Sequence, residues 1–171
     1  PYGTWIIREI ESPKGYVLSE EEIAVTIGKV DEVVEIELVN YFIKGNIVLT
    51  KVDEDYPDNK LSGAVFEVYS DTNGDGKLDK ADTLLGEMKE LDGGVYQMSE
   101  LRYGKYLVKE TKAPTGFVLD ENVYSVSVEE NGKTYTVENK AGVGFINAAQ
   151  KGSLKIVKTS SDGKVEGFSF R

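Results

Sequence analysis

The sequence YGTWIIREIESPKGY at residues 2–16 returns as YGKYLVKETKAPTGF at residues 103–117. Tyr, Gly, Glu, Pro and Gly occupy the same positions in both copies. A second motif, NYFIKGNIVLTK at residues 40–51, returns as NAAQKGSLKIVK at residues 147–158. Two motifs that recur in the same order indicate that the chain is built from internal repeats.

The repeats predict how the chain is divided. One complete repeat runs from about residue 44 to 150, and residues 1–43 correspond to the C-terminal strands of a preceding repeat. Residues 151–171 correspond to the first strand of a following repeat, and GFSF at 167–170 resembles GAVF at 63–66. Neither flank can bury both faces of a sheet by itself.

The pattern of side chains predicts an all-β fold. Runs rich in Val, Ile, Tyr, Phe and Thr, several of them alternating, are typical of strands. Asn131-Gly132 is a typical two-residue hairpin turn between two of these runs. Short strands at this spacing predict an immunoglobulin-like β-sandwich. The seven expected strands cover residues 46–52, 64–69, 94–98, 105–110, 124–129, 133–138 and 143–147.

Composition excludes several classes of function. The chain has 30 acidic and 20 basic residues, a net charge of −10, and neither Cys nor His. This balance argues against a nucleic-acid partner, and the missing residue types exclude disulfides, Cys/His zinc sites and Ser-His or Cys-His catalytic pairs. No run of 18 apolar residues predicts a membrane span. A glycosidase carboxylate pair is a weak alternative, because so many acidic residues make some pair inevitable.

Three polar residues of the complete repeat interrupt apolar strands. Lys51 follows Ile-Val-Leu-Thr at the end of one strand, Glu110 follows Tyr-Leu-Val-Lys, and Asn147 follows Val-Gly-Phe-Ile. Strand alternation allows all three side chains to face one core. Asn139 also closes a strand and is the alternative asparagine. The corresponding residues of the flanks are Glu9, Asn40 and Lys158.

This order of motifs resembles the Cna B-type (SpaA-like, prealbumin-like) repeat of Gram-positive surface adhesins and pilins. The resemblance rests on KVD at 51–53, KETKAPTGF at 109–117 and an asparagine that closes the last strand. It implies an inverse-immunoglobulin sandwich with an intramolecular isopeptide bond. The implied bond joins Lys51 to Asn147, with Glu110 assisting; Asn147 is preferred because it alone matches Asn40 before the Lys-Gly linker.

The residue types suit that chemistry. Burial disfavours the ammonium form of Lys51, and the neutral amine is a nucleophile. Burial also favours the protonated form of Glu110, which can then donate a hydrogen bond and transfer protons. No organic cofactor is expected, and the only reaction expected is this one on the chain itself.

A calcium loop is predicted at DTNGDGKLDKAD, residues 71–82. Its spacing fits oxygen ligands at loop positions 1, 3, 5, 7, 9 and 12, with Gly76 at position 6. Position 12 is an aspartate in place of the usual glutamate, and position 7 would offer a backbone carbonyl. The candidate ligands are Asp71, Asn73, Asp75, Lys77, Asp79 and Asp82.

These patterns and the resemblance together predict a stalk or spacer repeat at the cell wall of a Gram-positive bacterium. Its expected partners are neighbouring repeats of the same protein. The alternative is an adhesive module that contacts a host matrix protein or glycan, which predicts an exposed aromatic cluster on one face. A head-to-tail assembly that brings Lys158 of one molecule to Glu9 and Asn40 of another is a further hypothesis.

Overall fold

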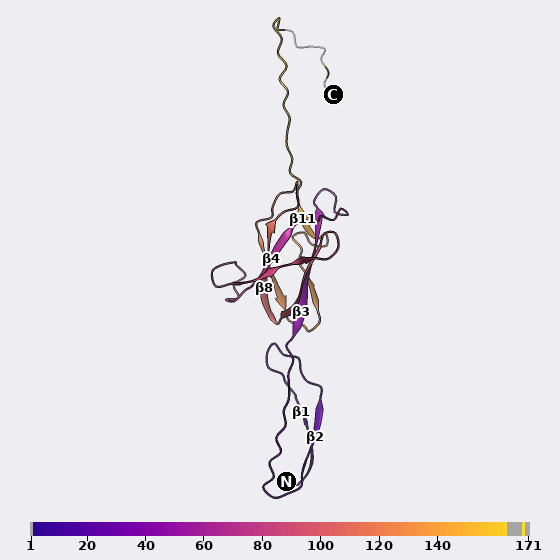
Figure 1. The fold of residues 1–171 in the computed structure, drawn as a ribbon, viewed down its shortest axis with the longest axis vertical. Coiled ribbons are helices and arrows are strands. Elements are labelled where there is room, and N and C mark those ends of the chain that lie inside the picture. Colours follow the sequence, from indigo (N-terminus) through magenta and orange to yellow (C-terminus); the bar gives the residue numbers. More distant parts are fainter. Residues whose placement is uncertain (1, 164–168, 170–171) are drawn as a thin grey trace.

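The computed structural model describes residues 2–163 and 169, so most of the 167–170 segment lies outside the described residues. All elements among the described residues are strands, which confirms the all-β prediction. No helix in this part of the chain is long and apolar enough to cross a membrane. Figure 1 shows an elongated molecule in which the strand-rich middle separates the two flanks.

Two sheets form the middle of the molecule, between residues 44 and 147. The first has the order β10-β3-β7-β6, and β11 also pairs with β3; the second has the order β5-β4-β8-β9. The first sheet contains β3 (Lys44–Asp53), β6 (Lys89–Glu90), β7 (Val95–Arg102), β10 (Thr134–Thr136) and β11 (Phe145–Asn147). The second contains β4 (Val65–Ser70), β5 (Thr83–Glu87), β8 (Gly104–Lys112) and β9 (Val123–Val128).

Strand β3 organises the first sheet, because three strands pair with it. Strand β7 runs antiparallel to it, from Lys44↔Arg102 to Thr50↔Val95. Strand β10 pairs in parallel with its first half and β11 in parallel with its last residues. The register Phe145↔Lys51 brings the first and last strands of the domain side by side.

The core lies between the two sheets. Alternate residues of β3 are buried, as a strand with one covered face requires. The Phe66 ring makes edge contacts with Tyr96 and Phe145, with ring centroids 5.1 and 4.9 Å apart. Tyr124 contacts the same Phe145 ring at 5.1 Å. This aromatic cluster holds the Phe145 side chain of β11 between the two sheets.

All seven expected strands of this domain are present, but the expected hairpin at Asn131-Gly132 is wrong. Strand β9 belongs to one sheet and β10 to the other, so the chain crosses between sheets at this turn. Gly132 has φ +75, whereas Asn131 is not among the residues with positive φ. The turn instead binds Lys44: Gly132 N donates to Lys44 O (2.7 Å) and Lys44 N donates to Asn131 Oδ1 (3.1 Å). Strands β5 and β6 were not among the strands expected from the sequence.

The N-terminal flank has the geometry of the second half of the domain. Its strands β1 (Gly3–Arg8) and β2 (Glu22–Ile27) pair from Gly3↔Ile27 onward. Strands β8 and β9 pair in the same register, from Gly104↔Val128, which preserves the offset of 101 residues between the repeats. The bridge Tyr16↔Phe42 likewise corresponds to Phe117↔Ala149.

The flank contacts the domain at the end of β7. Tyr103 N donates to Ile43 O at 2.9 Å, and the Arg102 guanidinium lies 4.0 Å from the centroid of the Phe42 ring. Phe42 in turn stacks on Tyr16, with centroids 4.7 Å apart. The flank is therefore anchored through its last residues.

Candidate functional site

Lys51 lies inside the sandwich because of its place in β3. Ile47 and Leu49, four and two residues before it, are fully buried on the same face, and the Lys51 side chain has no exposed surface. Its Nζ donates a hydrogen bond to Phe145 O at 3.0 Å and lies 5.3 Å from the centroid of the Phe145 ring. The alternation of β3 therefore delivers an amine into an apolar core.

Glu110 reaches the same region from the second sheet. It lies near the end of β8, opposite Phe66 of β4, and its side chain has no exposed surface. The Lys51 Nζ and Glu110 Oε1 atoms are 4.0 Å apart. Asp120 N donates to Glu110 Oε2 at 2.8 Å, so the loop between β8 and β9 holds the carboxyl group from behind.

Asn147 completes the cluster from the last strand. Its Nδ2 donates to both oxygens of Glu110, at 3.0 Å to Oε1 and 2.9 Å to Oε2. Its residue is 3% exposed, and Oδ1 has no hydrogen-bond partner. It is the one buried side-chain polar atom without a partner among the described residues. A buried acceptor without a hydrogen bond has lost its hydration without compensation, so this carbonyl destabilises the folded state.

Burial controls the protonation of both charged partners. Desolvation lowers the pKa of Lys51 to about 8, although the charges of Glu110, Asp120 and Asp53 oppose it. Burial also raises the pKa of Glu110, against the hydrogen bonds from Asp120 and Asn147 and the charge of Lys51. Both shifts favour the neutral forms, which are a free amine and a carboxylic acid.

Asn139, the alternative asparagine, lies beside this cluster but is bound differently. Its amide exchanges two hydrogen bonds with the backbone of Ile146 and donates a third to Asp120 Oδ2 at 2.8 Å. All of its polar atoms therefore have partners among structural groups. Asn147, not Asn139, contacts Glu110.

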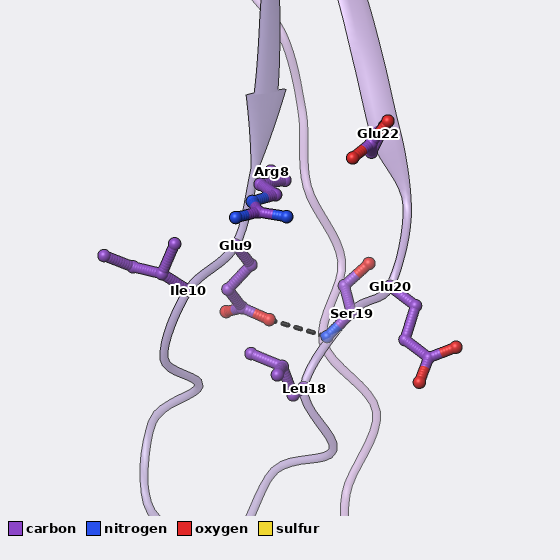
Figure 2. A pocket seen from close by; sticks show the side chains of 7 residues that line it. All are labelled: Arg8, Glu9, Ile10, Leu18, Ser19, Glu20 and Glu22. Carbon is purple, nitrogen blue, oxygen red and sulfur yellow. Dashed lines mark hydrogen bonds between the residues drawn. The ribbon is translucent and has the colours of Figure 1, made fainter.

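The flank repeats the Glu–Asn half of the cluster. Asn40 Nδ2 donates to Glu9 Oε1 and Oε2 at 2.7 and 2.8 Å, and Ser19 N donates to Glu9 Oε2 at 2.7 Å. Figure 2 shows Glu9 directed toward Ser19, at the wall of a pocket of about 460 Å³. Arg8 and Leu18 also line this pocket.

The structure does not bring Lys158 to this pair. Lys158 is exposed. It belongs to the segment after residue 150, which extends from the end of the domain opposite to the flank (Figure 1). The flank pair therefore has no counterpart of Lys51 from this segment of the same molecule.

The loop at residues 71–82 folds around its own backbone. The two carboxylate oxygens of buried Asp71 accept hydrogen bonds from Gly74 N and Gly76 N, at 2.7 and 3.1 Å. Those of Asp82 accept from Thr72 N and Asp79 N, at 3.1 and 2.8 Å.

The other candidate ligands remain near the surface of the loop. Asn73, Asp75 and Asp79 each accept a backbone N–H two residues ahead, and Lys77 supplies the N–H that Asp75 accepts. Lys105 Nζ donates to Gly74 O at 2.9 Å. Within the described part of the chain, no three acidic, His or Cys side chains converge as metal ligands would. The loop has the ligand types for calcium without their convergence.

Sequence reasoning missed two parts of the site, Asp120 and the carbonyl of Phe145. Asp120 follows Glu110 by ten residues, as Ser19 follows Glu9. The repeat could have indicated this position, but the residue type differs between copies. The Phe145 carbonyl is a backbone group, and no side-chain pattern identifies it.

Comparisons with known proteins agree with the all-β fold. The family model of the SpaA prealbumin-like fold domain matches residues 1–41 and 45–142. The structure of the Bacillus anthracis TIE protein is 30% identical, with a TM-score of 0.70 over 87% of this chain and 25% of that chain. BcpA, the major pilin subunit of Bacillus cereus, is 25% identical, with a TM-score of 0.49 over 78% of this chain and 35% of that chain. No curated protein matches the sequence.

Proposed function

Since the chain belongs to the family of SpaA prealbumin-like fold domains, we propose that it is a structural module of a surface pilus or adhesin. In this proposal an isopeptide bond between Lys51 and Asn147 closes the domain, and Glu110 assists its formation. One observation carries the proposal: an amine, a carboxyl and an amide from three separate strands meet without access to water.

The bond formation requires no reactant other than these three side chains. The neutral Nζ of Lys51 attacks Cγ of Asn147, the new C–N bond forms, and the bond from Cγ to Nδ2 breaks. One proton passes from the attacking amine to the departing nitrogen, which leaves as ammonia. The cluster holds the reactants together, which replaces a slow encounter by a reaction within one molecule.

Glu110 suits the role of acid and base. In its ionised form it accepts both hydrogen bonds from Asn147 Nδ2. Half a turn of the amide brings the unpartnered Oδ1 to the carboxyl, which in its protonated form donates a hydrogen bond to it. That bond polarises the carbonyl toward attack, and the carboxylate left behind can receive the proton of the amine.

The closed domain suits a load-bearing role. The bond closes a loop of 96 residues, and by the estimate for disulfides such closure is worth about 4–5 kcal/mol. Lys51 and Asn147 lie on adjacent parallel strands, and Asn147 is the last residue of β11. Tension that enters β3 therefore crosses the bond and leaves through the chain that follows Asn147. The strands between them carry none of it.

The remaining parts of the chain complete this proposal. Residues 1–43 and 151–171 belong to the preceding and following repeats, which are the partners of the domain. Glu9 and Asn40 would pair with a lysine on a strand of the preceding repeat that is equivalent to β3. Lys158 would be the corresponding lysine of the following repeat. The 71–82 loop binds calcium, a proposal that rests on its sequence pattern. The module acts at the cell wall, outside the cell.

The adhesive alternative lacks a supporting feature in the domain. Tyr56 is the one aromatic residue of 44–150 among the large exposed apolar residues of the described chain, so residues 44–150 offer no exposed aromatic cluster as a glycan platform. The other exposed aromatic residues lie in the N-terminal flank. Glu110 itself has no exposed surface, so it cannot serve as one carboxyl of a glycosidase pair. A spacer is therefore the better-supported role.

The intact mass of the purified chain tests the proposal. We expect the wild-type chain to be lighter than its sequence by one ammonia, and the variants Lys51→Ala and Glu110→Ala to have their full mass. Loss of a second ammonia would place a bond in the flanks as well. A wild-type mass equal to the sequence mass would overturn the isopeptide bond.

A further inference from the structure

Strand β11 has one free edge, and a side chain covers it. The strand is three residues long and pairs with β3 on one side only. On its other side, Asn139 Nδ2 donates to Ile146 O at 2.9 Å, and Ile146 N donates to Asn139 Oδ1 at 2.6 Å. One amide thus replaces the two backbone bonds that a neighbouring strand would make.

Ile146 is the residue between the two that matter for the reaction. Phe145 before it supplies the carbonyl that accepts a hydrogen bond from Lys51 Nζ, and Asn147 after it supplies the amide. Holding Ile146 therefore sets the depth and orientation of both groups relative to the amine.

Asp120 links this contact to the carboxyl. Its Oδ2 accepts hydrogen bonds from Asn139 Nδ2 (2.8 Å) and Tyr124 Oη (2.6 Å), while its own N–H binds Glu110 Oε2. Burial would raise the pKa of Asp120, but the hydrogen bonds from Tyr124, Asn139 and Asn122 outweigh it and lower that pKa. The residue is therefore a charged acceptor that fixes the Asn139 amide in one orientation.

We propose that Asp120 and Asn139 are positioning residues for the cross-linking reaction, a clamp that holds the Phe145–Asn147 strand against Lys51 and Glu110. This inference rests on the proposed isopeptide bond. Neither residue donates to or accepts from the reacting amine or amide. They act through Ile146 and through the Glu110 carboxyl.

The flank shows what the clamp adds. At the offset of 101 residues, Ser19 stands at the position of Asp120 and Ile23 at that of Tyr124. Ser19 N still binds Glu9, and the Glu9–Asn40 pair still forms. The clamp is therefore not needed to pair the carboxyl with the amide. What it contributes is control of the strand that faces the lysine.

The test is the rate of ammonia loss, followed by intact mass after dilution of denatured, unreacted chain into buffer. We expect Asn139→Ala to slow the loss by about 10- to 100-fold, the cost of a small misplacement of reacting groups. Tyr124→Phe removes one donor to Asp120 at nearly constant volume and should slow it less. Asn59→Ala, a change at an exposed asparagine outside both clusters, should leave the rate unchanged.

The pH profile separates positioning from general loss of structure. The reaction needs neutral Lys51, so its rate should rise with pH toward the Lys51 pKa of about 8. Glu110, Asp53 and Asp120 are the charged groups that raise this pKa. Asp120→Asn removes one of them and should move the rise to lower pH, whereas Asn139→Ala should lower the rate without moving it.

Folding is checked in a Lys51→Ala background, where no bond can form. Rates are compared at a temperature at which each variant remains folded in that background. A wild-type chain that loses ammonia while folded Asn139→Ala reacts equally fast would overturn the clamp alone. A wild-type chain that never loses ammonia would overturn both the clamp and the proposed bond.

Discussion

Lys51 Nζ and Glu110 Oε1 lie 4.0 Å apart, and neither side chain has any exposed surface. A buried ion pair recovers its desolvation cost only when its remaining hydrogen bonds are complete. Here Lys51 has one acceptor, Phe145 O, and the nearby Asn147 Oδ1 has no donor. The arrangement is poorly stabilised as a salt bridge. An isopeptide bond would remove the charge and retain the packing.

Glu110→Gln is expected to slow ammonia loss by about 10²- to 10⁴-fold, the usual contribution of a positioned acid or base. Glutamine keeps the size of the side chain but cannot exchange the proton. The mass of the refolded chain against time measures the rate. Glu87→Gln makes the same change at an exposed position of β5 and should have no effect. An unchanged rate in Glu110→Gln would exclude the acid–base role.

The pH dependence of stability should reveal Lys51 in an unreacted domain such as Asn147→Ala. The folded-state pKa of about 8 lies below the ordinary 10.5. Between these values the unfolded chain binds a proton that the folded chain has released, so stability rises with pH in this window. The expected gain is about 3 kcal/mol.

Denaturant unfolding at a series of pH values measures that gain. The matched control is Lys51→Met in the same Asn147→Ala background, which keeps the packing and removes the titrating group. The difference between the two curves isolates Lys51 from the other groups that titrate in this window. Parallel curves would show that the Lys51 pKa is not lowered.

Calcium binding should depend on the 71–82 loop. Titration calorimetry of the chain is expected to give a dissociation constant of roughly 10⁻⁴–10⁻³ M, as for extracellular calcium modules. Asp75→Ala removes the ligand at position 5 and should abolish the heat. Asp92→Ala changes an exposed turn aspartate outside the loop and should retain it. A wild-type chain without heat at millimolar calcium would dispose of the site.

Gly144→Ala should weaken the packing of β11 against β3 and lower the free energy of unfolding. Gly144 has φ +133, and a Cβ there would lie 2.8 Å from Thr50 O on β3. The strand must shift to relieve this contact, so we expect a loss of about 1–3 kcal/mol in the Lys51→Ala background. Gly28→Ala is the control, because its Cβ would meet nothing within 4 Å. Equal stability of the two variants would contradict the tight contact.

The sequence predicted the fold and the three residues of the cluster because repeated motifs and alternating side chains can both be read directly from the sequence. Ile47, Leu49 and Lys51 fall on one face of any strand, so the buried lysine was visible in the pattern. The repeat identified Glu110 and Asn147 as its counterparts, and the structure places them in contact.

Other features depend on tertiary contacts that no local pattern contains. Asn131-Gly132 has the composition of a hairpin turn, but its polar groups bind Lys44 and the two strands join different sheets. Asn139 has the residue type of a reaction partner, yet its amide covers the edge of β11. In both cases the residue type was informative, and the choice of partner was decided by chain segments far away in sequence.

The complete burial of the cluster also gives the proposed reaction a direction in time. Once ammonia has left, its attack on the bond, which is the reverse of the step, is no longer available. Because Lys51 and Glu110 have no exposed surface, water also does not reach the bond to hydrolyse it while the domain stays folded. Each molecule that has folded once would then keep the covalent bond. If the domain is later unfolded by force or heat, the bond still joins its first and last strands and favours refolding to the same pairing.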